Sequence, residues 1–466
     1  MNRDRRRAIM MWLGLWVVAA VIQFIHNEWL IVGFLGSLGM VIIYLKLENP
    51  EVLQDRKTGY FTQAAFVEYT RQYINSDTEF SLICMKYPPE LYAGRDEIRL
   101  EIQTQVAEYF KKLRKVYAFQ ADFDEVILMT EDAEYADYLM QSLQERFFLP
   151  WDAKGEYILN PNWLYIPKTF FMWETGDLLY TVRYLLNSKV HFASSNILLV
   201  DEAVVEEVYQ EKKVERLIVD ALEHNRVDTF YQPIYSTEQG RFTTAEALVR
   251  IRDEDGRLVP PGIFIEVAEK KGLILQLGER VFENVCQFIQ QENIEKYGLE
   301  YIEVNLSVVQ CAYEKLAEVF IHYMKKYNVN PKQINLEITE SASLTAKQNL
   351  VRNMEMLMDY GVRFSLDDFG TGQSNLNYII EMPVDIVKFD RSMILSYFEN
   401  GKAKYVMDAA MHMIHGMDLK IVSEGIETKE QFETMEYLGI NYIQGYYFSK
   451  PLSRNDFIAF LKKVQP

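Results

Sequence analysis

The strongest constraint on the fold is a repeated pattern between about Lys212 and Pro466, in which short apolar runs end in polar residues. Helix-like stretches such as Gly278–Gln291 and Lys347–Tyr360 separate most of the runs. The eight runs end at Gln232, Glu246, Asn305, Glu337, Asp367–Asp368, Asp390, Glu424 and Gln444. A β/α barrel typically needs about 250 residues and places its chemistry at the rim where its strands end. The pattern therefore predicts an α/β barrel whose mouth carries these polar side chains.

Carboxylates dominate this predicted mouth, and Lys388 is the only cation among its polar residues. The carboxylates are Glu246, Glu337, Asp367, Asp368 and Glu424, and Asn305 and Gln444 add amides. Several carboxylates that face one cavity repel each other unless they are neutralised. All-oxygen ligands suit Mg²⁺ or Mn²⁺, whereas the lack of Cys and imidazole in the set argues against zinc. The adjacent pair Asp367–Asp368 is suited to bridging two cations about 3.5–4 Å apart, the arrangement used for phosphodiester cleavage.

The residues at these positions resemble the motifs of one enzyme family. Residues Glu246–Arg250 read Glu-Ala-Leu-Val-Arg, which is the signature of EAL domains. Further motifs similar to those of the family follow in order at Asn305–Ser307, Leu336–Glu340, Asp367–Gly372, Lys388–Asp390, Glu424–Glu427 and Gln444–Tyr446. EAL domains are cyclic di-GMP phosphodiesterases with a modified TIM (β/α)8 barrel, and they use Mg²⁺ or Mn²⁺ to release linear pGpG. The resemblance implies this fold, substrate and reaction for the C-terminal domain, residues 206–466.

The resemblance also implies a two-metal site. One ion would be held by Glu246, Asn305, Glu337 and Asp367, and a second by Asp367, Asp368 and Glu424. Lys388 would orient or deprotonate the attacking water, because a lysine beside two cations loses its proton more readily.

Further roles follow from the same resemblance. Gln232 and Arg250 would contact the dinucleotide, and a guanidinium is the natural partner of a phosphate. Glu340 would brace the loop Asp368–Gly372, which in this family couples dimerisation to metal binding. The residues expected to surround the metals or bind water are Asp390, Glu427 and Gln444.

Departures from the family pattern are small and remove none of these ligands. Ser423 stands where Ala is usual, and Gln373 and Asn375 stand where smaller residues are common. EAL domains that only sense cyclic di-GMP usually lack some ligands. The complete set therefore favours a phosphodiesterase over the alternative, an inactive EAL receptor that binds cyclic di-GMP and signals to a partner.

Residues 51–205 mix strand-like and helix-like segments, which predicts an α/β domain. Asp55–Phe66 resembles the entry segment of GGDEF domains, which make cyclic di-GMP from GTP, and Gln120–Asp124 lies where their signature should fall. Both signature glycines are replaced, and the strand that should carry a metal-binding Asp ends in Met85–Pro88 instead. The resemblance implies a degenerate, inactive GGDEF-like domain with a regulatory, dimer-forming or spacer role. An unrelated α/β domain remains the alternative.

Residues 1–50 differ in composition from the rest of the chain. Two apolar segments, about 8–25 and 29–45, flank the polar tripeptide His26–Glu28, and Arg3, Arg5, Arg6 and Arg7 precede them. Each segment is at the short end of a bilayer span, which takes about 17–25 residues. The sequence predicts a membrane hairpin with both ends in the cytoplasm, in the bacterial inner membrane, because clustered arginines stay on that side. A buried soluble helical hairpin is the alternative.

Charge and cysteine content exclude other classes of protein. The chain has 49 Lys plus Arg against 67 Asp plus Glu, a net charge of −18, which argues against binding DNA or RNA polymers. Its three cysteines, Cys84, Cys286 and Cys311, are far apart and too few for a disulfide framework. The expected partners are cyclic di-GMP, the membrane and a second copy of the chain, paired through the EAL or the GGDEF-like domain.

Overall fold

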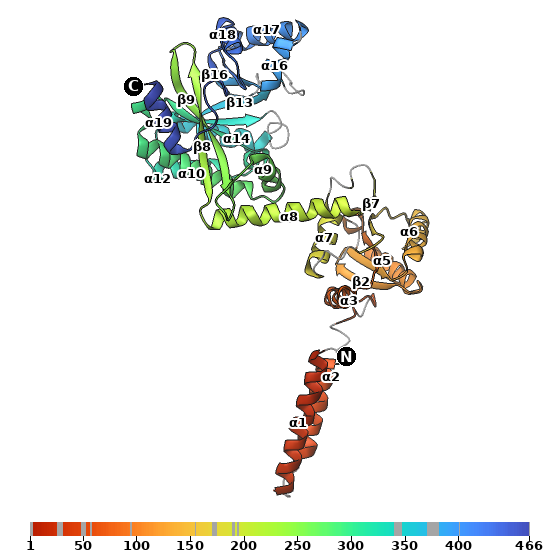
Figure 1. Ribbon diagram of the computed structural model, residues 1–466. Coiled ribbons are helices and arrows are strands. Elements are labelled where there is room, and N and C mark those ends of the chain that lie inside the picture. The colour runs from red at the N-terminus through yellow and green to blue at the C-terminus, as the bar shows by residue number, and fades with distance from the viewer. Residues whose placement is uncertain are drawn as a thin grey trace. The chain divides into compact units, whose positions relative to one another are not determined.

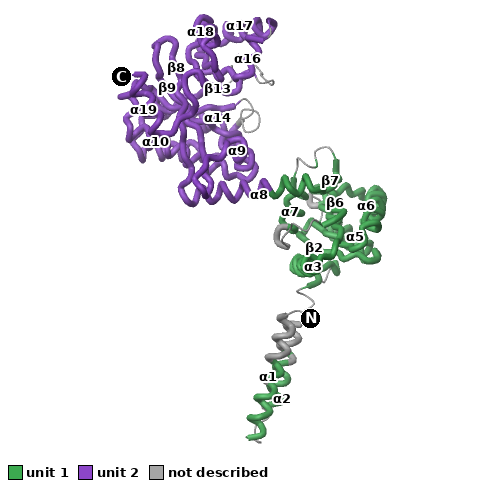
Figure 2. The backbone as a smooth tube through the Cα atoms, viewed as in Figure 1, with its two compact units in different colours: residues 1–209 green, residues 210–466 purple. Residues whose placement is uncertain are grey.

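The computed structural model divides the chain into two compact units, Met1–Tyr209 and Gln210–Pro466 (Figure 2). The division falls within helix α8 (Glu202–Glu223), as does the predicted domain boundary between residues 205 and 206. The structure describes residues 3–25, 31–47, 53–55, 58–93, 96–153, 155–169, 175–188, 192, 195–339, 347–370, 382–399 and 401–465.

The N-terminal residues form two helices that pack against each other, α1 (Arg3–Ile25) and α2 (Ile31–Leu47) (Figure 1). The Gln23 side chain accepts a hydrogen bond of 2.9 Å from the backbone N–H of Val32, which joins the end of α1 to the start of α2. Within the described residues, no helix combines the length and the apolar composition needed to cross a membrane.

The middle of the chain is an α/β domain, as predicted (Figure 1). Its sheet has the order β2-β3-β1-β6-β7, in which β1 pairs antiparallel with β3 and β6, and β6 pairs parallel with β7. The strands are β1 (Ser81–Lys86), β2 (Tyr117–Asp122), β3 (Glu125–Thr130), β6 (Asn162–Ile166) and β7 (Ile197–Leu199). The main helices are α3 (Gln63–Asn75), α5 (Asp96–Lys111), α6 (Ala133–Phe148) and α7 (Thr175–Asn187).

This sheet is covered on both faces because side chains alternate along a strand. On β1, Ile83 and Met85 join the core formed with α5 and α6, whereas Leu82 and Cys84 join the core formed with α3 and α7. The alternation therefore produces three layers, with the sheet between two pairs of helices.

The C-terminal unit is an eight-stranded barrel, which confirms the predicted fold (Figure 1). The barrel strands are β8 (Val227–Ser236), β9 (Arg241–Arg252), β11 (Tyr301–Leu306), β12 (Ile334–Thr339), β13 (Arg363–Phe369), β14 (Ile386–Phe389), β15 (Lys420–Ser423) and β16 (Tyr442–Gln444). The short strand β10 (Leu258–Val259) extends the edge of β9. Helices of this unit include α9 (Pro261–Lys270), α10 (Ile274–Glu292), α12 (Leu316–Lys326), α14 (Lys347–Tyr360), α16 (Arg391–Glu399), α17 (Gly401–Gly416), α18 (Lys429–Tyr437) and α19 (Arg454–Val464).

The strand β8 departs from the predicted arrangement. It closes the barrel by pairing antiparallel with both β9 and β16, whereas the pairs from β9 and β11 round to β15 and β16 are parallel. The expectation that all eight runs end at one rim is therefore wrong for β8, which runs in the opposite direction. Gln232 lies in the middle of β8, where it pairs in register with Glu246 of β9.

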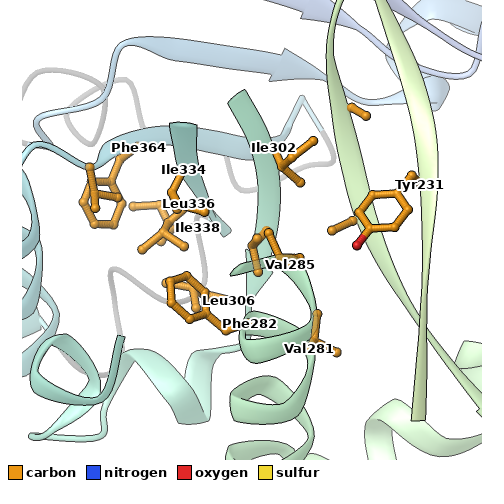
Figure 3. Packing of buried hydrophobic residues seen from close by; sticks show 14 of the residues in the cluster. Tyr231, Val281, Phe282, Val285, Ile302, Leu306, Ile334, Leu336, Ile338 and Phe364 are labelled. Carbon is orange, nitrogen blue, oxygen red and sulfur yellow. The ribbon is translucent and has the colours of Figure 1, made fainter. Parts of the chain in front are cut away.

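The outer faces of the barrel strands form the main hydrophobic core with the surrounding helices. Ile302, Leu336 and Phe364 from the strands pack with Val285 of α10 in this core (Figure 3). The rings of Phe282 on α10 and Phe320 on α12 stack at 3.8 Å between centroids and 5° between planes. This packing fixes the strands against the surrounding helices, and the strands in turn position the side chains on the inner face of the wall.

Candidate active site

Along four strands, β11, β14, β15 and β16, the inner face of the barrel changes from apolar to polar toward the mouth. A small buried cluster contains Ile234, Tyr301, Ile386, Val422 and Tyr442. Four of these residues lie two positions before a polar one, namely Glu303, Lys388, Glu424 and Gln444, so the two sets share a face of the wall. This buried cluster forms the floor of the lumen, and the polar side chains stand above it toward the mouth.

Glu246 is held by two amides from other strands. Its Oε1 accepts a hydrogen bond of 2.6 Å from Asn305 Nδ2 on β11, and its Oε2 accepts one of 2.6 Å from Gln444 Nε2 on β16. Gln444 Nε2 also lies 3.2 Å from Gln232 Oε1, and Gln232 Nε2 donates to the carbonyl oxygen of Ser449. The structure thus brings together four residues that the sequence placed in one site, although Gln232 is buried and engaged within the barrel.

A close backbone approach keeps Gln444 in place. The N–H of Ile426 donates to the carbonyl oxygen of Gln444 at 3.1 Å, and the N–H of Tyr447 donates to that of Ile426 at 2.9 Å. A Cβ on Gly445 would overlap the backbone of Ile426. Glycine is therefore required after Gln444 for the end of β16 to reach the segment that follows β15.

Lys388 is the electrostatic centre of the site. Its Nζ lies 2.6 Å from Glu337 Oε1 and 2.6 Å from Glu424 Oε1, and its side chain is 1% exposed. Burial alone would lower the pKa of Lys388, but the carboxylates of Glu246, Glu337 and Glu424 hold it well above the ordinary lysine value. The ammonium is therefore kept charged by the carboxylates that surround it.

Glu303 is a carboxylate of this cluster that the sequence analysis missed. It lies on β11 two residues before Asn305, is 0% exposed, and its Oε2 lies 3.7 Å from Lys388 Nζ. Burial, and then the charge of Glu303, raise the pKa of Glu337 well above the usual range, against the lowering effect of Lys388. The signal was the spacing of two residues within a strand, which puts Glu303 and Asn305 on the same face.

Glu424 lies at the edge of this cluster, where its side chain is 23% exposed. Removal from water by the barrel wall raises its pKa to about 8, although the nearby Lys388 ammonium acts in the opposite direction. The charges of Asp367 and Glu246 add to the increase in pKa. Glu424, Asp367 and Glu246 repel one another when all three are ionised. A positively charged group bound among them would stabilise their ionised forms.

The pair Asp367–Asp368 lies at the mouth, at the end of β13. The backbone N–H of Asp368 donates to Asp367 Oδ1 at 2.8 Å, and Asp368 has a φ of 59°. The register of β13 with β14 is also irregular between Leu366 and Phe369. Strict alternation is broken here, so the rule that would direct Asp368 to the outer face of a regular strand does not apply.

The remaining predicted residues lie around the mouth. Arg250 follows Glu246 by four residues on β9, and its guanidinium lies 5.5 Å from the centroid of the Phe230 ring. Burial lowers the pKa of Arg250, while Tyr446 and Glu246 oppose that change. Asp390 Oδ1 accepts from the N–H of Ser392 at the start of α16, and Glu427 pairs with Arg391 at 2.7 Å. Glu340 and the loop residues 371–372 lie outside the described residues.

The donor set fits hard divalent cations in its chemistry. Glu246, Asn305, Glu337 and Asp367 offer only oxygen ligands, and Glu337 Oε2 has no hydrogen-bond partner among the described residues. Across the same residues, no group of three or more His, Cys, Asp or Glu side chains is arranged as an ion-binding cluster. The carboxylates are instead arranged around Lys388 and the two amides.

Comparison with known proteins identifies the family. The model of the EAL domain matches residues 215–451, which is half of the chain, and the chain belongs to this family. The match covers the barrel and the polar residues of its mouth.

Similar proteins carry related names. The chain is 34% identical over 250 residues to the probable cyclic di-GMP phosphodiesterase PdeB of Escherichia coli, covering 52% of this chain and 46% of PdeB. It is 32% identical over 239 residues to the bifunctional diguanylate cyclase/cyclic di-GMP phosphodiesterase MucR of Pseudomonas aeruginosa, covering 51% of this chain and 35% of MucR. The chain thus spans less than half the length of these relatives.

A solved structure is similar over the same region. The PaMucR phosphodiesterase in complex with c-di-GMP has 31% sequence identity and a TM-score of 0.50. The similarity covers 53% of this chain and 99% of that one.

The raised pKa of Glu424 predicts how the stability of the metal-free protein depends on pH. The folded state binds this proton more tightly than the unfolded chain, where a glutamate has a pKa of about 4.3. The contribution of Glu424 is therefore present at low pH and is lost as the pH rises toward about 8. We expect the thermal unfolding midpoint in EDTA to fall between about pH 5 and pH 8, and the fall to be smaller in Glu424→Gln. Equal pH dependence in both proteins would contradict the assignment.

Proposed function

We propose that the chain is a metal-dependent phosphodiesterase that hydrolyses cyclic di-GMP to linear pGpG. The observation that carries this proposal is the convergence, in one barrel lumen, of Lys388 with the oxygen donors of five strands. Glu337 and Glu424 contact Lys388 directly, and Glu246 stands in the same lumen between the amides of Asn305 and Gln444. Such a set has no evident structural purpose, because buried carboxylates cost stability unless they are neutralised.

The residues proposed to hold Mg²⁺ or Mn²⁺ are those that the family resemblance implies. They are Glu246, Asn305, Glu337 and Asp367 for one cation, and Asp367, Asp368 and Glu424 for the other. When bound, such cations polarise the phosphate and lower the pKa of a coordinated water. Asn305 and Gln444, which hold Glu246 from both sides, fix the orientation of this carboxylate before a cation arrives.

Lys388 is proposed to position the attacking water. The reaction forms a bond from the water oxygen to phosphorus, breaks one phosphorus–oxygen ester bond of the ring and passes a proton to the departing sugar oxygen. With the carboxylates alone, Lys388 stays protonated and acts as a hydrogen-bond donor. A role as a base requires cations to offset the charge of Glu337 and Glu424.

The substrate assignment is supported by the relatives and by the rim of the barrel. PaMucR, at 31% identity, was solved as a complex with c-di-GMP. Arg250 is half-buried beside the mouth, where a guanidinium can bind a phosphate through two parallel hydrogen bonds. Gln232 is proposed to act with it, from a strand that runs beside β9.

Substitutions at two residues test the proposal. Glu246→Ala should abolish hydrolysis because it removes a proposed ligand, and Lys388→Ala should abolish turnover while largely sparing cyclic di-GMP binding. Loss of a general base costs about 10²–10⁴ in rate. Calcium should support binding without cleavage, because its longer bonds and looser geometry disturb the two-metal arrangement. The measurement is pGpG formation by the purified protein in Mg²⁺, Mn²⁺ or Ca²⁺.

A surface carboxylate provides the control for this series. Glu433 on α18 pairs with Lys429 at 3.2 Å on the exposed surface, so Glu433→Ala should retain wild-type activity. Full activity in Lys388→Ala would remove this residue from the mechanism. Binding of cyclic di-GMP by the wild type without any pGpG would identify the chain as a receptor.

We further propose that the middle domain is a degenerate GGDEF-like domain without cyclase activity. Lys86 ends β1, where a metal-binding Asp would be needed, and its Nζ lies 3.6 Å from Asp124 and 3.7 Å from Glu125. Arg183 on α7 pairs with Asp122 and, at 3.3 Å, with Glu125. Two cations thus already occupy the carboxylates of this region, which opposes binding of a magnesium ion.

The full-length protein should therefore form no cyclic di-GMP from GTP. The assay must follow GTP consumption as well as the product, because the barrel would hydrolyse any cyclic di-GMP formed. The Lys388→Ala variant, which should lack hydrolysis, is the background in which product would accumulate. Measurable cyclic di-GMP in that background would contradict the proposal, whereas GTP binding without turnover would be compatible with it.

Residues 1–50 are proposed to attach the chain to the bacterial inner membrane, with the middle domain (residues 51–205) and the EAL domain (residues 206–466) in the cytoplasm. Val17, Val18 and Phe24 on α1 and Phe34 on α2 expose more than half of their side chains, and lipid would cover such apolar surface. The full-length chain should sediment with membranes after an alkaline wash, and a variant that lacks residues 1–50 should not. Recovery of the full-length chain in the supernatant would contradict the attachment. A homodimer through either unit remains a prediction.

A further inference from the structure

Glu303 is a buried carboxylate with no cation at salt-bridge contact shorter than 3.7 Å among the described residues. It is 0% exposed on the inner face of β11, and its oxygens accept no hydrogen bond from an N–H or hydroxyl donor of the described residues, although the carboxyl group of Glu337 interacts with it. Its nearest cation is Lys388, at 3.7 Å. An ionised carboxylate in such a place is costly unless it is paired and fully hydrogen-bonded.

Glu303 adds a further carboxylate to this cluster. The single ammonium of Lys388 already faces Glu337 and Glu424, each at 2.6 Å. With every group ionised, these three would carry a net charge of −1 and Glu303 would bring the cluster to −2, and the raised pKa values of Glu337 and Glu424 relieve this repulsion by protonation. Glu303 therefore adds repulsion whenever its neighbours are ionised.

The three carboxylates around Lys388 differ in their proposed tasks. Glu337 and Glu424 belong to the proposed metal ligands, so their oxygens would turn toward cations when the site is filled. Lys388 would then lose both of its short contacts. Glu303 lies outside the ligand set, on the same strand as Asn305 and one layer closer to the apolar floor.

We propose that Glu303 is a positioning residue that holds the Lys388 ammonium when Glu337 and Glu424 bind metal. Its carboxylate attracts Nζ from the floor side and keeps the lysine directed along the lumen, in reach of the attacking water. This inference rests on the proposed phosphodiesterase function. It adds a residue that none of the sequence motifs contains.

The test uses Glu303→Gln, which keeps the size of the side chain and removes its charge. Loss of a residue that orients a catalytic group typically lowers activity about 10–100-fold. We expect that loss in kcat, with KM and calcium-supported cyclic di-GMP binding changed less than about twofold, since Glu303 contacts neither substrate nor metal. Glu303→Asp should recover part of the rate, because it restores the charge at a greater distance.

A matched control separates this effect from general damage to the barrel. Ser423 is 0% exposed on β15, and its Oγ has no hydrogen-bond partner within the described part of the chain. Ser423→Ala should keep the wild-type rate. Wild-type kcat in Glu303→Gln, or a rate in Glu303→Asp no higher than in Glu303→Gln, would overturn the proposal.

A stability measurement distinguishes failure of this inference from failure of the proposed function. Thermal unfolding in EDTA is compared for wild type, Glu303→Gln, Lys388→Met and the double variant. Glu303→Gln should raise the unfolding midpoint more in the Lys388→Met background, where no ammonium offsets the carboxylate. If the wild-type protein makes no pGpG, the proposed function is overturned. The non-additive unfolding midpoints would still show that Glu303 and Lys388 interact. Additive midpoints would overturn the contact, and with it the role of Glu303, whatever the activity.

Discussion

The C-terminal unit is organised around one buried ammonium. Lys388 is 1% exposed and draws Glu337 and Glu424 to 2.6 Å, with Glu303 behind it. Without this cation, the facing carboxylates would repel each other in a medium of low dielectric constant. The residues beneath the cluster are buried, and a buried setting makes the dependence on Lys388 stronger. The arrangement is stable as an ion cluster and, at the same time, presents oxygen donors to the mouth.

The antiparallel strand that closes the barrel shapes a second part of the site, the hydrogen-bonded group around Glu246. Because β8 runs against β9 and β16, Gln232 lies beside Glu246 and near Gln444 instead of at a distant strand end. The amides of Asn305 and Gln444 hold the two oxygens of Glu246, each at 2.6 Å. One side of the lumen is thus fixed by hydrogen bonds from amides to a carboxylate, and the other side by ion pairs. The two halves would respond differently to a cation, since on the amide side no cationic side chain has to be displaced from Glu246.

The sequence predicted the barrel and most of the residues that meet in its lumen, because polar residues at the ends of apolar runs identify the rim. It did not predict the direction of β8, because an apolar run reads alike in a parallel and an antiparallel strand. Glu303 was missed because only the polar residues at the ends of apolar runs were taken as site residues, and Glu303 lies one layer deeper in its strand. Its spacing of two residues from Asn305 nevertheless places both on one face. The short ion pairs of Lys388 also could not be predicted, since they depend on side-chain positions across β12, β14 and β15.

In the proposed mechanism the same carboxylates would serve two competing uses, and this competition would link metal binding to the protonation state of Lys388. Glu337 and Glu424 cannot each hold both the ammonium and a divalent cation through the same oxygen. A cation that takes these oxygens therefore weakens the contacts that raise the pKa of Lys388, and its own charge lowers that pKa further. In this scheme the lysine becomes available to a water molecule only after the metal sites fill. The ion cluster would thus keep the reactive amine protonated until the rest of the catalytic site is assembled.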